Sequence, residues 1–184
     1  MQALIFVLDA LITLIVIAFL LRALFPLVRA DFRNPIGQAV LRVTDPLVLP
    51  LRKLLRPAGR VDVAAIVALL IVQITGTALI FGLAGAPMAS PLSIVAVALR
   101  DLARTVLQFY FFAVLLHVVL SWVAPGAHSP AAAILQRLCE PLLRPLRRVI
   151  PPLGGLDLSP LIVILLLQAI MIALPFPSSL TYLR

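Results

Sequence analysis

The chain has 184 residues, of which 63% are hydrophobic and 12% are charged, and its formal net charge is +8. A soluble domain of this length could not bury so much apolar side chain, so the composition excludes a water-soluble protein and favours a membrane protein. The basic residues lie between apolar runs and have no aromatic platform beside them, which argues against nucleic acid as a partner.

The first apolar run, 4–28, contains two charged residues, Asp9 and Arg22. A membrane span needs about 20 apolar positions, so one of these charges must fall inside it. Arginine can extend its side chain to the interface whereas aspartate cannot, which predicts a span over 10–28 with Arg22 snorkelling toward one membrane face. Asp9 then lies at the opposite rim.

A basic, proline-rich connection follows at 29–61. Within 35–55, apolar residues recur at helical spacing and most charged residues fall on other faces, which predicts an amphipathic helix in the membrane interface. Pro46 and Pro50 remove backbone amides, so a kink or restart is expected near them. The second long connection, 124–157, repeats this plan, with Pro141 and Pro145 as its proline pair.

Three further spans are predicted over the apolar runs 63–83, 105–123 and 158–174, and residues 87–104 are expected to form an external linker. Asp62 and Asp157 directly precede the second and fourth spans. A short carboxylate there can accept hydrogen bonds from the free amides of the first turn and meet the positive end of the helix dipole, so both are predicted to be helix caps.

A shift of 95 residues lays the chain over itself without a gap across 34–73. The matched positions include Pro46 with Pro141, Arg52 with Arg147, Asp62 with Asp157 and Gln73 with Gln168. This predicts a tandem duplication, with one copy at 1–86 and the other at 105–184. The predicted fold is an all-α membrane protein of four transmembrane helices, arranged as two parallel hairpins with amphipathic interfacial helices in both connections.

Arg and Lys are concentrated in the two connections, with seven in residues 29–60 and four in 124–156, against two in 84–104. The positive-inside rule therefore places both connections in the cytoplasm and both termini outside. Basic side chains near the ends of the connections are candidates for binding anionic headgroups or a partner protein: Arg52, Lys53, Arg56, Arg144, Arg147 and Arg148. The alternative is that they only fix the topology and touch lipid phosphates.

Four polar side chains are expected at membrane depth: Gln73, Gln108, His117 and Gln168. Gln73 and Gln168 either hydrogen-bond between the copies or line a hydrated cation path, to which Thr75, Thr77 or Gln108 would add oxygens. Packing with one hydrogen bond is favoured for His117 over haem ligation, because a second histidine within the spans is lacking. Asp9 could pair with Arg100 or Arg104 near the external face.

The chain shows no nucleophile–base constellation, metal-ligand spacing or phosphate-binding loop, so we expect no enzymatic activity, no metal and no cofactor. Cys139 is the single cysteine, which excludes an internal disulfide.

The segments around both proline pairs resemble the YggT family of small bacterial integral membrane proteins, related to YlmG-type proteins of plastids. The likeness rests on Asp45-Pro46 with Pro50-Leu51-Arg52-Lys53, on 140–152 and on 154–160. The first copy departs from the pattern at 60–65, where Gly-Leu-Asp-Leu-Ser-Pro would be expected. The resemblance implies a multi-pass protein of the bacterial inner membrane, associated with osmotic stress tolerance and potassium uptake, and with cytochrome-complex assembly and nucleoid or division organisation in plastids. It brings no catalytic residues.

Two hypotheses follow. In the first, the protein is a scaffold or assembly factor whose basic cytoplasmic segments bind anionic lipid headgroups and membrane-protein partners. In the second, it forms, as a homo-oligomer, a cation pathway used in osmotic adaptation. The first is favoured, because four short spans leave little room for a wet lumen within one monomer.

Overall fold

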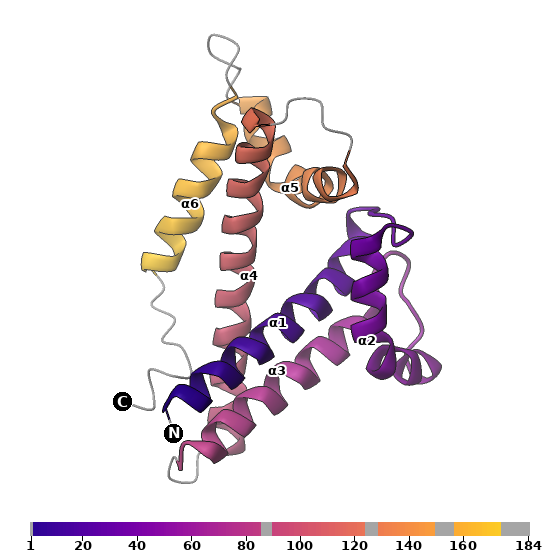
Figure 1. The fold of residues 1–184 in the computed structure, drawn as a ribbon, viewed down its shortest axis with the longest axis vertical. Coiled ribbons are helices and arrows are strands. Elements are labelled where there is room, and N and C mark those ends of the chain that lie inside the picture. Colours follow the sequence, from indigo (N-terminus) through magenta and orange to yellow (C-terminus); the bar gives the residue numbers. More distant parts are fainter. Residues whose placement is uncertain (1, 86–89, 124–128, 150–156, 174–184) are drawn as a thin grey trace.

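Six helices make up the described part of this computed structural model, which covers residues 2–85, 90–123, 129–149 and 157–173 (Figure 1). They are α1 (Gln2–Leu27), α2 (Pro35–Leu54), α3 (Val63–Leu83), α4 (Pro91–Val123), α5 (Pro130–Val149) and α6 (Ser159–Ala173). The described residues contain no β-strand apart from an isolated bridge between Ala58 and Val61. The prediction of an all-α protein is confirmed.

Three of these helices, α1, α3 and α4, are long and apolar enough to cross a membrane, which makes the chain a membrane protein. Helix α6 is as apolar but has 15 described residues. At 1.5 Å per residue this is about 22 Å, shorter than the roughly 30 Å hydrocarbon core. The last residue of the predicted fourth span, Leu174, lies outside the described residues, as do parts of both 87–104 and 124–157.

Helix α4 begins at Pro91, whereas the sequence predicted a span starting only at 105. Residues 91–104, assigned above to an external linker, are therefore helical. The Oγ of Ser90 accepts a hydrogen bond from the Ser93 amide at 3.2 Å, and proline suits a first helical position that has no amide partner. Arg100, Asp101 and Arg104 thus sit on one long helix and not in a loop.

Helices α2 and α5 both run through their proline pairs. Figure 1 shows that each changes direction along its length, as the missing amides would cause. Both bounds of α5 lie 95 positions beyond those of α2. Their starts also correspond: Asn34 Oδ1 accepts from the Gly37 amide at 2.8 Å, and Ser129 Oγ accepts from the Ala132 amide at 3.1 Å.

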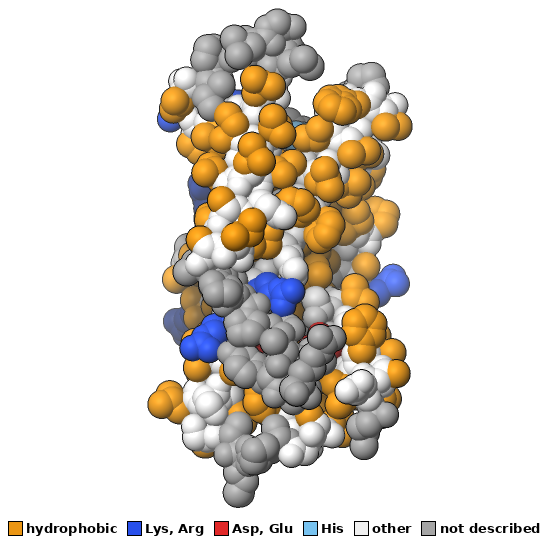
Figure 2. All heavy atoms as spheres, turned by 90° about the vertical axis from the view of Figure 1, so that its left-hand side faces the viewer, with side chains coloured by type: hydrophobic (Ala, Val, Ile, Leu, Met, Phe, Trp, Pro, Cys, Tyr) orange, Lys and Arg blue, Asp and Glu red, His pale blue; other side chains and the backbone are white. Residues whose placement is uncertain are grey.

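The six helices pack as two similar halves. In the first half α1 packs against α3 and α2, and in the second half α4 packs against α6 and α5. Helix α3 also packs against α4, and α2 meets α5 at the end of the molecule remote from the first residues of α1 (Figure 1). Large hydrophobic side chains cover much of the exterior, as Figure 2 shows for one face, and this is the surface that lipid would contact.

Each half has its own apolar core, and a third cluster joins the halves. The joining cluster consists of Phe25 and Ala30 from the end of α1 and the segment after it, and Ile134 and Leu138 from α5. The guanidinium of Arg137 donates to the backbone carbonyl of Arg29 at the same place. The second half is therefore attached to the first through α5 and through α4, which packs on α3 and α1.

Candidate functional site

Each amphipathic helix is tied to the helix that follows it by an arginine–aspartate ion pair. Arg52 near the end of α2 pairs with Asp62, which precedes α3. Arg147 near the end of α5 pairs with Asp157 at 2.8 Å and also with Glu140 at 3.2 Å. The two pairs occupy positions 95 residues apart. Arg52 and Arg147 thus hold α2 and α5 against the next helices, a role that the sequence did not predict for them.

Both aspartates also cap the following helix. Asp62 Oδ1 accepts from the Ala65 amide at 3.2 Å, and Asp157 Oδ1 accepts from the Ser159 amide at 2.9 Å. Burial alone would raise the pKa of Asp157, but hydrogen bonds from Ser159 and Arg147 outweigh it and leave this pKa below its usual value. The carboxylate is therefore stabilised in its charged form.

Arg22 does not snorkel, contrary to the prediction. Its side chain is buried, and its Nη2 lies 3.0 Å from Asp45 Oδ1 on α2. Its guanidinium carbon also lies 5.1 Å from the ring centroid of Phe32, a cation–π distance. The position 95 residues further holds His117, which is half-buried on α4. A charge inside a predicted span needs a partner, and this requirement could have pointed to a buried pair, which the sequence analysis did not predict.

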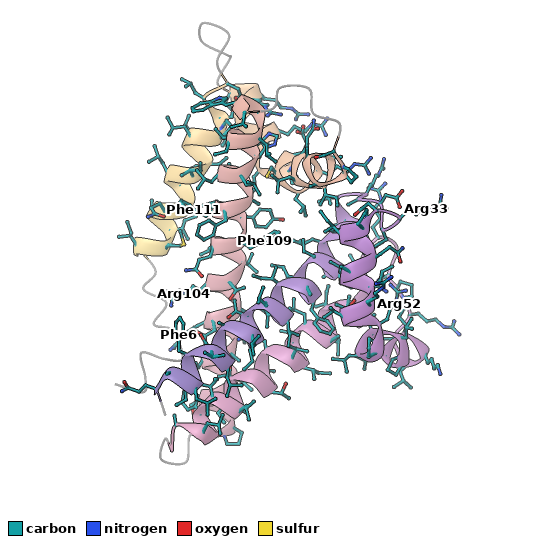
Figure 3. The ribbon with its side chains drawn as sticks, viewed as in Figure 1. Phe6, Arg33, Arg52, Arg104, Phe109 and Phe111 are labelled. Carbon is teal, nitrogen blue, oxygen red and sulfur yellow. The ribbon has the colours of Figure 1, made fainter. Side chains whose placement is uncertain are left out.

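The remaining basic candidates are exposed: Lys53, Arg56, Arg144 and Arg148. We call these four residues the exposed basic set. They belong to the ends of α2 and α5 or follow directly; the end of α5 lies at the top of Figure 1 beside α4, and the end of α2 lies lower, on the right-hand side. Arg52, labelled in Figure 3, lies beside them on the α2 side. The set is available to phosphates or to an acidic partner.

A polar cavity of about 200 Å³ lies between α1, α3 and α4. Its polar lining consists of Asp9, Thr13, Gln73, Thr77, Asp101, Arg104, Thr105 and Gln108. Asp9 and Arg104, which the sequence offered as a possible pair, line the same cavity, whereas Arg100 does not line it. Figure 3 shows Arg104 on α4 close to α1. Asp101 was missed, because its segment was taken for a linker.

The two glutamines predicted to act together are placed differently. Gln73 is buried and donates to Thr77 Oγ1 on its own helix at 3.3 Å, whereas Gln168 is exposed on α6. Thr75 is exposed and donates to the Ile71 carbonyl at 2.6 Å, so it does not line the cavity. The predicted hydrogen bond between the copies is therefore replaced by one within α3.

The cavity extends inward from the rim of the bundle. Gln73 lies near the middle of α3, while Asp9 lies within the first turns of α1. At the wall, a Cβ on Gly76 would stand 2.6 Å from Cγ2 of Ile12, so α1 and α3 approach each other too closely there for a larger residue without rearrangement. The cavity thus reaches toward the middle of α3 beside a tight helix–helix contact.

Other chemistry has little support in the described residues. Within these ranges, no group of three or more His, Cys, Asp or Glu residues could hold a metal ion. Cys139 is buried, and burial raises its pKa to about 12, so its thiol is a packing group with little thiolate at neutral pH.

Comparison with known proteins gives one family and several relatives. The model of the CCB3/YggT family matches residues 1–83 and 96–177. An uncharacterized protein, PA0392, of Pseudomonas aeruginosa is 40% identical over 174 residues, which cover 91% of this chain and 86% of the relative. The uncharacterized protein YggT of Escherichia coli K12 is 35% identical over 171 residues, covering 92% and 88%. The chloroplastic YlmG homolog protein 2 of Arabidopsis thaliana is 43% identical over 63 residues, covering 34% and 25%. No solved structure matches.

Proposed function

Because the chain belongs to the CCB3/YggT family, we propose that it is a non-enzymatic membrane scaffold or assembly factor that acts through its two basic amphipathic helices. The observation that carries this proposal is the exposed basic set on the two amphipathic helices, which internal ion pairs hold in place.

We further propose that the protein is a duplicated, four-span protein of the bacterial inner membrane, with both connections in the cytoplasm and both termini outside. Three observations support duplication: the identical offset between α2 and α5, the equivalent pairs Arg52–Asp62 and Arg147–Asp157, and the two separate segments matched by the family model. The fourth span would be α6, extended beyond its described residues. The excess of Arg and Lys in the connections supports the orientation.

In this scaffold the two kinds of basic residue have different roles. Arg52 and Arg147 fix the ends of α2 and α5 by intramolecular ion pairs, so they contribute little to binding. The exposed basic set binds anionic headgroups, at about 1 kcal/mol per residue near an anionic surface, and it binds acidic segments of membrane-protein partners. Osmotic adaptation is the process in which we expect this scaffold to act.

The test is lipid retention by the protein in nanodiscs that contain a neutral lipid and a minor fraction of phosphatidylglycerol. Wild-type protein should enrich phosphatidylglycerol around itself, as measured by mass spectrometry of the bound lipid. The quadruple variant of the exposed basic set to glutamine should lose this enrichment. Arg100→Gln on α4, remote from α2 and α5, is the matched control and should keep it. Equal enrichment by the quadruple variant would reject the proposal.

The polar cavity favours a second candidate function, a cation pathway. Two carboxylates, Asp9 and Asp101, and the neutral oxygens of Gln73, Thr77 and Gln108 line it together with one cation, Arg104. In potassium-flux measurements on liposomes, this function requires that Asp9→Asn and Gln73→Leu abolish flux. Thr75→Val, on α3 but outside the cavity lining, should leave flux intact. Absence of flux with the wild-type protein would remove this candidate.

A further inference from the structure

The two halves of the molecule do not contact each other symmetrically. In the first half, α3 packs against α1 of its own hairpin and also against α4 of the other half. Helix α6, which holds the place of α3 in the second half, packs against α4 and α5, and α1 is not among its main contacts. Figure 1 shows α6 standing apart from α1. One helix-binding face of each half is therefore left without its counterpart.

The exposed face of α6 is broad and also includes Leu166 and Ile170, and one stripe can be followed along it. Leu161, Leu165, Gln168 and Ile172 are all exposed and follow one another at intervals of four, three and four residues. This spacing places them along one side of a helix, as in a seam that packs against another helix. The opposite side of α6, with Val163 and Leu167, is buried against α4. The stripe is thus the side that its own hairpin does not use.

A groove of about 380 Å³ between the two halves of the structure matches this stripe in chemistry. Helices α1, α4 and α5 line it, and α3 does not. Phe112 and Leu116 give it apolar walls, and Gln108, Thr13 and Thr105 supply polar groups at one end. Gln108, Phe112 and Leu116 form a stripe along α4 like that on α6. The groove therefore has an amide next to apolar side chains along one helix, as the stripe on α6 does.

Lipid tails are a poor occupant for these two surfaces, because they offer no hydrogen bond to an amide. Amide side chains inside a span face partner helices or water instead. Gln168 corresponds to Gln73, and Gln73 lines the same polar cavity as Gln108. Gln168 is thus expected at the depth of Gln108. The α6 of the same chain packs on the opposite side of α4 through Val163 and Leu167, so it does not reach the groove beside α1.

We propose that the groove between α1 and α4 receives α6 of a second copy of this chain, in a head-to-tail contact that joins copies into a homo-oligomer. Leu165 of one copy then packs on Phe112 of the other, and Gln168 hydrogen-bonds with Gln108. This inference rests on the proposed placement of α6 as a span, but it does not depend on lipid binding by the exposed basic set.

The test is disulfide cross-linking between two chains that carry different tags, in a Cys139→Ala background. One chain carries Phe112→Cys and the other carries Leu165→Cys, and both are expressed together in the same membrane. Mild oxidation should yield a linked product that carries both tags. The matched control replaces the groove position by Leu79→Cys, an exposed position on α3, and should yield no such product with Leu165→Cys. Co-expressed Gln108→Cys and Gln168→Cys chains provide a second pair.

Three outcomes would overturn the proposal. Equal cross-linking with the Leu79→Cys control would show random collision, and absence of linkage in both pairs, with chains that elute like wild type, would show that lipid covers the groove. Linkage only within a single chain carrying Phe112→Cys and Leu165→Cys would show that α6 closes on its own chain. The lipid-retention assay tests the proposed scaffold function separately, because its variants change neither Phe112 nor Leu165.

Discussion

The two ion pairs Arg52–Asp62 and Arg147–Asp157 occupy equivalent positions, yet we expect them to differ in their contribution to stability. The side chain of Asp62 is 4% exposed and that of Asp157 is 38% exposed, whereas both arginines are 39% exposed. Replacing Arg52 by methionine strands a buried carboxylate, and replacing Arg147 leaves a carboxylate that water reaches. Breaking a buried pair typically costs about 3–5 kcal/mol, and an exposed pair contributes about 0–1 kcal/mol.

We expect Arg52→Met to lower the free energy of unfolding by about 2–3 kcal/mol, below the range for fully buried pairs because water reaches Arg52 and the Ala65 amide still bonds Asp62. Arg147→Met should lower it by about 1 kcal/mol or less. The assay is equilibrium unfolding of purified protein in mixed detergent micelles, followed by circular dichroism. In an Asp62→Ala background the effect of Arg52→Met should nearly vanish, because its partner is gone. Equal losses for the two arginine variants would refute the reasoning.

Three more predictions concern packing, pH and reactivity. Gly76→Ala should lower the free energy of unfolding by about 1–3 kcal/mol through overpacking against Ile12, and an Ile12→Ala background should restore it. Gly82→Ala, at a position with open space around it, should be neutral or stabilising. A loss at Gly82 as large as that at Gly76 would contradict the contact between Gly76 and Ile12. The pKa of Asp157 is lower in the folded protein than in the unfolded chain, so this carboxylate stabilises the fold above the unfolded pKa of about 4, and the stabilisation is lost as the pH falls through the folded-state pKa. In Asp157→Asn the free energy of unfolding should therefore depend less on pH in that acid range. A pH dependence equal to that of the wild type would contradict this role of Asp157. Cys139 should resist maleimide at pH 8 in the folded protein and react rapidly after unfolding in SDS, and fast labelling of the folded protein would disprove its burial.

Local sequence patterns predicted the helices well where one pattern dominates. The amphipathic spacing of 35–55 gave α2 almost to its bounds, and the uncharged run 63–83 gave α3. The start of α4 was missed because Arg100, Asp101 and Arg104 were read as solvent-exposed linker residues. Their helical environment includes a cavity that α1 and α3 complete, and a local pattern does not contain those distant helices.

The candidate site was predictable in its residue types but not in its pairing. The sequence pointed to Asp9 and Arg104, which share the cavity, yet it assigned Arg52 to phosphates and Arg22 to the membrane surface. Their actual partners, Asp62 and Asp45, lie on other elements, so the pairing depends on how the helices pack. Gln73 was expected to meet Gln168, but an acceptor one turn away on α3 was nearer.

The contact of α5 with the first half bears on the order of events during synthesis. Ile134 and Leu138 rest on Phe25 and Ala30, and Arg137 reaches the carbonyl of Arg29, while the corresponding positions on α2, Ala39 and Val43, stay exposed. The second half thus packs on a surface that belongs to the first half. The ribosome synthesises the amino-terminal half first, so the surface on which α5 packs can form before α5 is made. If the two halves were synthesised in the reverse order, α5 would be made before that surface exists.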